Sequence, residues 1–263
     1  MSSNWSAEVQ SRYKERGYHF PVDVLSPAEV SRYRGLLEDF ERAHGPMEGP
    51  RRSKMHLVLT WLDELVHHPR ILDAVEGALG PDFLCWSSSF FIKEPGDPSF
   101  IAWHQDATYW GLNATEIATA WLALSPATPE SGCMKFKPAT HLAPVAHHET
   151  DSEYNMLSRS QEIAVAVDER DAVHAVLRPG QASLHHVLLF HGSEANKSTD
   201  RRIGFAIRYV AAHVGRLDGR KGSATLARGI DRYGHFAHEP RPHADLEPRA
   251  VEIHDRIVSS RSG

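Results

Sequence analysis

Apolar side chains recur at helical spacing in the first 82 residues of the chain. Residues 26–29 read Ser-Pro-Ala-Glu, a capping box with proline at the first helical position. These signals predict a helix that ends near residue 44 and buries Val30, Tyr33, Leu36, Leu37 and Phe40. A second apolar face over residues 69–79 stops at a Gly-Pro pair and predicts another packing helix.

The pattern changes at residue 83. Short runs rich in β-branched and aromatic residues alternate with clusters of Gly, Pro, Asn and Asp, which is typical of a sandwich or barrel of short strands. The polar residues 149–162 predict a loop or short helix lying over this barrel. The predicted strands are 83–92, 103–109, 117–124, 134–136, 173–176, 182–190 and 202–210.

Helices followed by many strands indicate an α+β fold with a mainly β core, shaped as a barrel or jelly-roll with N-terminal packing helices. We expect one domain over residues 1–263. Within it, residues 1–82 give mainly helical support, 83–213 form the jelly-roll core, and 214–263 form an irregular tail.

Composition narrows the class of protein. The chain has 263 residues, of which 41% are hydrophobic and 24% charged, as in a soluble globular protein. Its 29 Lys and Arg against 34 Asp and Glu leave a net charge of -5, which argues against nucleic-acid binding. With no long apolar run and no signal-like N-terminus, we expect a cytoplasmic protein that does not enter a membrane. No pattern fixes the oligomeric state.

Histidine is unusually frequent, with 18 residues, and one of them opens a His-x-Asp sequence at His104 and Asp106. Chance alone produces about one such pair in a chain of this composition, and a second pair at His243 and Asp245 in the tail is taken to be of that kind. The first pair differs because it lies in a predicted strand, where residues two apart share a face. Both side chains are therefore expected to point into the barrel.

A metal needs a third ligand, and His191 is the best candidate because it follows an apolar run and precedes a glycine. Two His and one carboxylate leave coordination sites open, which favours non-haem Fe(II) over zinc. Such an iron takes electrons most often from 2-oxoglutarate, whose far carboxylate needs a cation. Arg202 fits this role, because strand alternation places it on one face with two small residues and Arg208. Ser193 can add a hydroxyl.

The chain resembles the phytanoyl-CoA dioxygenase family of Fe(II)- and 2-oxoglutarate-dependent oxygenases. The resemblance covers most of the chain and is carried by YKERGYHFPVDVLSPAEV, HHPRILDAVEGALGPDF, FIKEPG, WHQDATYWGL, TAWLALSPATPESGCMKFKPATH and HGSEANKSTDRR. It implies a double-stranded β-helix, the cupin-like jelly-roll that the strand pattern also predicts. It further implies a dioxygenase that hydroxylates a small organic molecule with O2 and releases succinate and CO2. The chain carries Ala139 where relatives usually have glycine, which affects a turn.

The resemblance also implies site residues. The iron ligands fall on His104, Asp106 and His191, and the 2-oxoglutarate arginine falls on Arg202. Further positions around the co-substrate fall on Trp121 and Ser193, with a basic residue of the N-terminal region at Lys54 or His56.

Several alternatives remain at this point. A cupin-like module that binds or senses a metal without turnover is the main one, although such a module has no use for Arg202. A zinc hydrolase lacks support because no His-Glu-x-x-His motif is present. Arg208 and Arg52 are candidate contacts for an anionic substrate. The adjacent His185 and His186 are interpreted as hydrogen-bonded core residues, of which only one can face the barrel.

Overall fold

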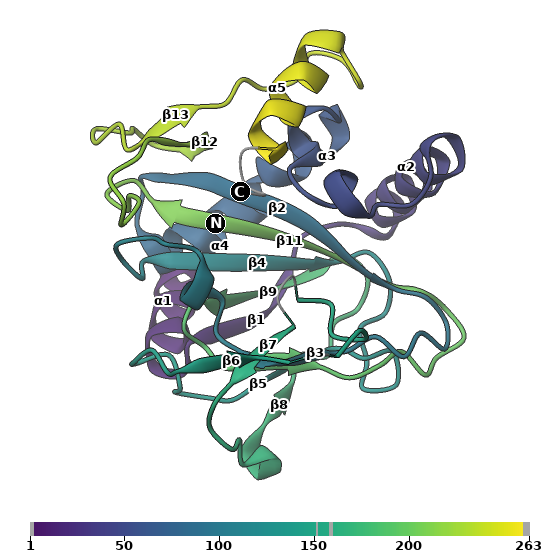
Figure 1. Cartoon of the computed structure of the whole chain (residues 1–263), viewed down its shortest axis with the longest axis vertical. Coiled ribbons are helices and arrows are strands. Elements are labelled where there is room, and N and C mark those ends of the chain that lie inside the picture. The colour runs from purple at the N-terminus through teal and green to yellow at the C-terminus, as the bar shows by residue number, and fades with distance from the viewer. Residues whose placement is uncertain (1–2, 151, 158–159, 260–263) are drawn as a thin grey trace.

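The computed structural model describes residues 3–150, 152–157 and 160–259. Two sheets face each other in it, and the helices lie mainly against the outer side of the larger one (Figure 1). The helices are α1 (Ser3–Arg16), α2 (Pro27–His44), α3 (Thr60–Val66), α4 (Pro69–Leu79) and α5 (Pro248–Ser259), with short 3-10 turns η1 (Gly49–Arg52), η2 (Met55–Leu57), η3 (Asp106–Tyr109) and η4 (Glu169–Asp171).

The sheets have the strand order of a jelly-roll, in which neighbours in space are distant in sequence. The major sheet contains, from edge to edge, β1 (Tyr18–Asp23), β9 (Gln181–His186), β4 (Ile117–Ala123), β11 (Arg202–Ala211), β2 (Phe83–Lys93), β12 (Gly222–Arg228) and β13 (Phe236–His238). The minor sheet contains β3 (Ile101–His104), β10 (His191–Ser193), β5 (Met134–Phe136) and β8 (Val173–His174). A separate hairpin pairs β6 (His147–Glu149) with β7 (Gln161–Ile163). The predicted double-stranded β-helix and α+β class are confirmed.

Local signals place the main helices where the sequence predicts them. The Ser26 hydroxyl accepts from the Glu29 amide at 3.3 Å, and the Glu29 carboxylate accepts from the Ser26 amide at 2.7 Å. These two bonds close the predicted capping box of α2 and satisfy donors that have no partner within the helix.

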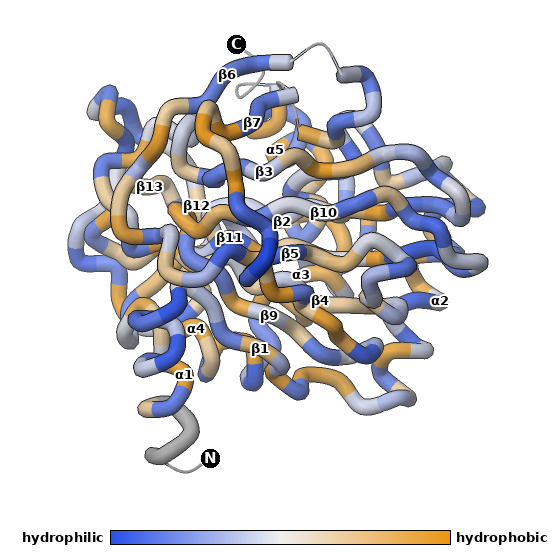
Figure 2. Tube along the Cα trace, turned by 90° about the horizontal axis from the view of Figure 1, so that it is seen from below, coloured by the Kyte–Doolittle hydropathy of each residue, from blue (hydrophilic) through white to orange (hydrophobic). Residues whose placement is uncertain are grey.

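The two faces of the major sheet differ in chemistry. Along β11, Ile203, Phe205 and Ile207 are buried in the cluster shared with the helices, while Arg202, Ala206 and Arg208 line a cavity between the sheets. The alternation expected for residues 202–210 is therefore present, and it separates an apolar core from a polar interior. Figure 2, which looks from the side of the minor sheet, shows that hydrophilic and hydrophobic segments alternate along the chain.

Four expectations about local structure need correction. The supporting segment 1–82 also contains a strand, β1, which pairs with β9 at the sheet edge. The predicted strand 103–109 ends at His104, and Asp106 begins the turn η3. The predicted strand 182–190 is broken by a turn, so that β9 and β10 join different sheets. The predicted loop 149–162 begins and ends in the strands of the β6–β7 hairpin, although 151 and 158–159 lie outside the described residues.

The tail is also more regular than expected. Residues 214–263 contain β12, β13 and α5 rather than irregular structure alone. The reason is long-range pairing, because β12 adds to the edge of β2, while α5 packs near η2 and buries Ala250 and His254. Among the described residues, no helix combines the length and apolar character needed to cross a membrane.

Candidate metal centre and co-substrate pocket

Three of the predicted site residues converge where the minor sheet meets η3. His191 is paired directly with His104 across β10 and β3, and Asp106 follows two residues after His104 on the turn. The Nε2 atom of His104 lies 3.4 Å from Oδ1 of Asp106. One potential ligand atom from each of His104, Asp106 and His191 lies within 4.8 Å of the others. This spacing suits one metal ion bound by two imidazoles and a carboxylate.

The ring orientation of both histidines is fixed by the backbone. The Nδ1 atom of His104 lies 2.9 Å from the Ala102 carbonyl, and that of His191 lies 2.9 Å from the Leu189 carbonyl. A carbonyl only accepts, so each Nδ1 carries the proton and each Nε2 presents its lone pair to the metal position. The two imidazoles are therefore prepared as ligands before a metal binds.

The charges of the site also suit a cation. Burial alone would raise the pKa of Asp106, but the surrounding groups, which include the imidazole of His185 and the charge of Arg208, outweigh burial and hold that pKa well below its usual range. Burial, reinforced by the neighbouring His104 and His185, lowers the pKa of His191 well below its usual value. The centre thus offers an ionised carboxylate beside a neutral imidazole, the protonation states that metal binding requires.

The triad opens into a cavity between the two sheets. Its apolar lining comes from both sheets and from the segment after β6, and its polar lining includes both arginines of the β11 inner face. The lining residues are Phe91, Ile101, His104, Asp106, Thr119, Trp121, Met134, Leu157, His185, His191, Gly192, Ser193, Arg202, Ala206 and Arg208.

Arg202 is the most unusual group in this cavity. Its side chain is 0% exposed, and none of its three guanidinium nitrogens has a hydrogen-bond partner among the described residues. Its guanidinium carbon lies 5.4 Å from the ring centroid of Trp121. Burial lowers the pKa of Arg202 to about 10, which still leaves it charged at neutral pH. A buried charge with unused donors is costly unless a ligand supplies the anion.

A glycine makes room for the Trp121 ring beside this guanidinium. Gly204 faces the Trp121 ring so closely that a Cβ atom at this position would lie 1.8 Å from a ring carbon. Ser193, at the end of β10, lines the same pocket. Trp121 and Ser193 therefore both line the pocket that holds Arg202.

The basic residue beside Arg202 is Lys93, which sequence reasoning missed. Lys93 pairs with Arg202 across β2 and β11, and its ammonium nitrogen lies 2.8 Å from the Ser193 hydroxyl. Burial, together with the charge of Arg202, lowers the pKa of Lys93 to about 6. The signal was available, because the strand alternation that brings Phe91 inward also brings Lys93 inward.

Lys54 and His56 are not part of this pocket, so that expectation was wrong. The Lys54 ammonium forms a buried ion pair with Glu239 and also donates to the Ser223 carbonyl at 3.2 Å. The His56 ring lies 2.7 Å from the Ser88 hydroxyl through Nδ1. Both residues are occupied by the C-terminal segment and the outer face of β2, and neither lines the cavity.

The two candidate substrate cations differ in position. Arg208 lines the cavity, whereas Arg52 lines a separate pocket next to it. Arg52 donates to the backbone carbonyls of Phe90 and Met156 at 3.1 and 3.2 Å. The structure thus brings Arg208, but not Arg52, to the metal cavity.

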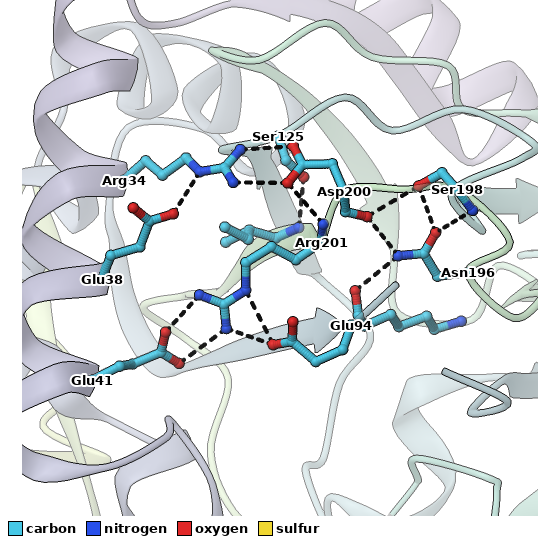
Figure 3. Close-up of polar contacts among 11 residues, drawn as sticks. Arg34, Glu38, Glu41, Glu94, Ser125, Asn196, Ser198, Asp200 and Arg201 are labelled. Carbon is cyan, nitrogen blue, oxygen red and sulfur yellow. Dashed lines mark hydrogen bonds and ion pairs between the residues drawn. The ribbon is translucent and has the colours of Figure 1, made fainter. Parts of the chain in front are cut away.

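A network of ion pairs holds the chain segment that leads into Arg202 (Figure 3). Arg34 of α2 contacts both carboxylate oxygens of Asp200 at 2.8 and 2.9 Å. Arg201 pairs with Glu41 of α2 and with Glu94 just after β2. Arg201 is therefore directed away from the cavity by its two carboxylate partners, and helix α2 fixes where β11 begins.

Comparison with known proteins gives this geometry a family context. The phytanoyl-CoA dioxygenase family model matches residues 13–204. A probable alpha-ketoglutarate-dependent hypophosphite dioxygenase of Stutzerimonas stutzeri is 29% identical over 231 residues, covering 78% of this chain and 79% of that protein. Alpha-ketoglutarate is another name for 2-oxoglutarate.

Solved structures are also similar to this chain. The non-heme monooxygenase ThoJ, in its apo form, is 36% identical with a TM-score of 0.85, covering 97% of this chain and 96% of that one. CytC3 with Fe(II) and alpha-ketoglutarate is 26% identical with a TM-score of 0.67, covering 94% of this chain and 97% of that one.

Proposed function

We propose, from the premise that this chain belongs to the phytanoyl-CoA dioxygenase family, that it hydroxylates a small anionic molecule at an Fe(II) held by His104, Asp106 and His191. When bound, the iron and 2-oxoglutarate supply an oxidant from O2: one oxygen atom replaces a substrate hydrogen as hydroxyl, and the other enters succinate as CO2 leaves. O2 gains four electrons, two from the substrate and two from 2-oxoglutarate.

The observation that carries this proposal is the unpartnered guanidinium of Arg202. A metal-binding or sensing module without turnover would gain nothing from a fully buried cation in its cavity. An enzyme that binds 2-oxoglutarate needs such a cation for the far carboxylate, and guanidinium binds carboxylate in a bidentate manner. Ser193 lines the same cavity, and Lys93 donates to its hydroxyl at 2.8 Å, so Lys93 supports this end of the cavity through Ser193.

The residues of the chain have distinct tasks in this proposal. His104 and His191 present Nε2 to the iron because their Nδ1 protons are held by the backbone. Arg202 binds and orients 2-oxoglutarate, and the ring of Trp121 lies beside the guanidinium, with its centroid 5.4 Å from the guanidinium carbon. Both cysteines, Cys85 and Cys133, are buried thiols, which suits our expectation that the enzyme acts in the reducing cytoplasm.

The test is succinate release from purified protein supplied with Fe(II), 2-oxoglutarate and O2. We expect slow release without substrate, faster release when a substrate is added, and none after chelation. Asp106→Ala should abolish release and weaken Mn(II) binding by roughly tenfold or more in calorimetry.

Asp245→Ala is the matched control, because it removes the aspartate of the other His-x-Asp pair. Asp245 accepts hydrogen bonds from the Thr60 amide and hydroxyl at 2.7 and 2.6 Å at the start of α3. This contact serves the helix end and not the metal cavity. Its loss should leave succinate release unchanged. Tight zinc binding without any consumption of 2-oxoglutarate would contradict the proposal.

A further inference from the structure

We propose that Arg208, Thr119 and His185 form a second anion subsite beside the metal centre, which binds the charged group of a compact oxyanion substrate. The substrate class is a phosphonate, phosphinate or short carboxylate whose oxidised atom belongs to the charged group or is bonded directly to it. This inference rests on the proposed function, since it assigns the second cation of the same cavity.

The three residues form one polar row across the major sheet. Arg208 pairs with Thr119 across β11 and β4, and Thr119 pairs with His185 across β4 and β9. Paired residues on one face have their side chains about 5 Å apart. All three line the cavity of the metal triad, so a single small ligand can contact the whole row.

The row borders the carboxylate ligand. The Thr119 hydroxyl lies 3.4 Å from Oδ2 of Asp106, and Nε2 of His185 lies 3.8 Å from the same atom. The Asp106 oxygen that faces the row is therefore not the one nearest His104, which is Oδ1. An anion held by the row lies next to the metal position, with little space for a chain between the charge and the oxidised atom.

Two groups in the row keep hydrogen-bonding capacity beyond the 3.8 Å contact of His185 with Asp106 and the bond of Arg208 to Ser89. His185 is 2% exposed, and neither ring nitrogen has a hydrogen-bond partner among the described residues. Buried polar atoms of this kind are rare unless a ligand satisfies them. In Arg208, Nη1 donates to the Ser89 hydroxyl at 2.6 Å. Its guanidinium carbon lies 5.5 and 5.7 Å from the ring centroids of Trp110 and Phe91.

The two arginines of the β11 inner face then serve different anions. Arg202 and Arg208 are six residues apart, about 20 Å along an extended strand. One 2-oxoglutarate cannot use both while it chelates the iron, so Arg208 is left for the substrate. The hypophosphite dioxygenase among the relatives is named for a small phosphorus oxyanion, in agreement with this class.

The test is calorimetric titration of protein loaded with Ni(II) and 2-oxoglutarate. Ni(II) takes the place of iron and prevents turnover. The probes are methylphosphonate, hypophosphite and propionate, with the uncharged dimethyl methylphosphonate as the ester control. We expect at least one of the three anions to bind wild-type protein and the ester not to bind. The anion that binds most tightly distinguishes a phosphorus oxyanion from a carboxylate.

Variants assign the subsite to its residues. Arg208→Met should weaken the anion by roughly tenfold or more and leave the 2-oxoglutarate constant within about twofold. His185→Phe keeps the ring and removes both nitrogens, and should weaken the anion by roughly threefold or more. Arg52→Met is the matched control, since Arg52 lies outside the cavity, and should change anion affinity by less than about threefold.

Three results would overturn the subsite. They are no binding of any of the three anions by wild-type protein that binds 2-oxoglutarate, ester binding as tight as anion binding, or unchanged anion affinity in Arg208→Met. The wild-type comparison of anion and ester decides the matter even if a variant fails to fold. Failure of the proposed function is different, because the wild-type protein would then bind no 2-oxoglutarate.

Discussion

Lys54 and Arg202 are both cations with 0% exposure, yet their surroundings are opposite. Lys54 forms an ion pair with Glu239, whose carboxylate also accepts from the hydroxyls of Ser223 and Thr225 at 2.7 and 3.0 Å. The guanidinium nitrogens of Arg202 have no hydrogen-bond partner among the described residues. A buried charge with an internal partner therefore serves the fold, whereas one without a partner marks a place for a ligand.

Loss of the Lys54 charge should change the stability of the protein more than any other substitution described below. Lys54→Met leaves Glu239 buried without its counter-charge and should lower the free energy of unfolding by about 3–5 kcal/mol. The double variant Lys54→Met, Glu239→Gln removes both charges and should be more stable than the single variant. Urea denaturation measures both. Equal stability of the wild type and the single variant would show that the ion pair has no structural role.

Arg202→Met should behave in the opposite way. Removing a buried charge that has no partner leaves no group uncompensated, so the metal-free variant should be at least as stable as the wild type. The melting temperature of metal-free protein, without 2-oxoglutarate, is the measurement. A drop comparable to that of Lys54→Met would mean that Arg202 has a structural partner and would remove the contrast.

The protonation state of Lys93, which lies beside Arg202, should make 2-oxoglutarate binding depend on pH. Burial beside Arg202 lowers the pKa of Lys93 to about 6, whereas an unfolded lysine titrates near about 10.4. Between these two pH values the unfolded chain binds more protons than the folded protein, so stability rises with pH. Below about pH 6 the ammonium of Lys93 is charged in both states, and the cost of burying that charge is fully present.

An arriving carboxylate should raise the pKa of Lys93, so binding at pH 8 should take up a proton. Calorimetry in buffers of different ionisation enthalpy detects this uptake. Lys93→Met should abolish it, and a binding enthalpy that is the same in all buffers would contradict the expected coupling.

Weakening the ion pairs that lead into β11 should change 2-oxoglutarate affinity least. Asp200→Asn weakens the contact with Arg34, but the Asp200 side chain is 51% exposed, and exposed pairs contribute about 0.2–1 kcal/mol. The 2-oxoglutarate affinity should change by less than about twofold, since Arg201 remains tied to Glu41 and Glu94. A large loss of affinity would show that the loop position is set by Asp200 alone.

Local signals predicted much of the fold and the centre of the site. The capping box determined the start of α2, and alternation along residues 202–210 placed Arg202 and Arg208 on one face. Asp106 lies beside His104 as predicted, but on η3 and not on the strand from which its position was inferred. Ala139, where relatives usually have glycine, has a φ of 60°, as a glycine position in a turn would.

Long-range partners explain what the sequence did not predict. Nothing near Lys54 indicates that Glu239, 185 residues away, takes its charge, so Lys54 was placed in the wrong site. Alternation allowed only one of His185 and His186 to face the barrel, but the choice depends on the register of β9 against β4. That register turns His185 to the cavity, while the ring of His186 lies 5.2 Å from that of His141.

The most direct test of the comparison is the affinity of Mn(II)-loaded protein for 2-oxoglutarate, measured for wild type, Arg202→Met and Lys54→Met. A buried bidentate pair that loses one partner costs about 2–5 kcal/mol, so Arg202→Met should bind at least tenfold more weakly. Folded Lys54→Met should bind as the wild type does. Unchanged affinity in Arg202→Met, or an equal loss in both variants, would contradict the claim that the unpartnered cation is the ligand site.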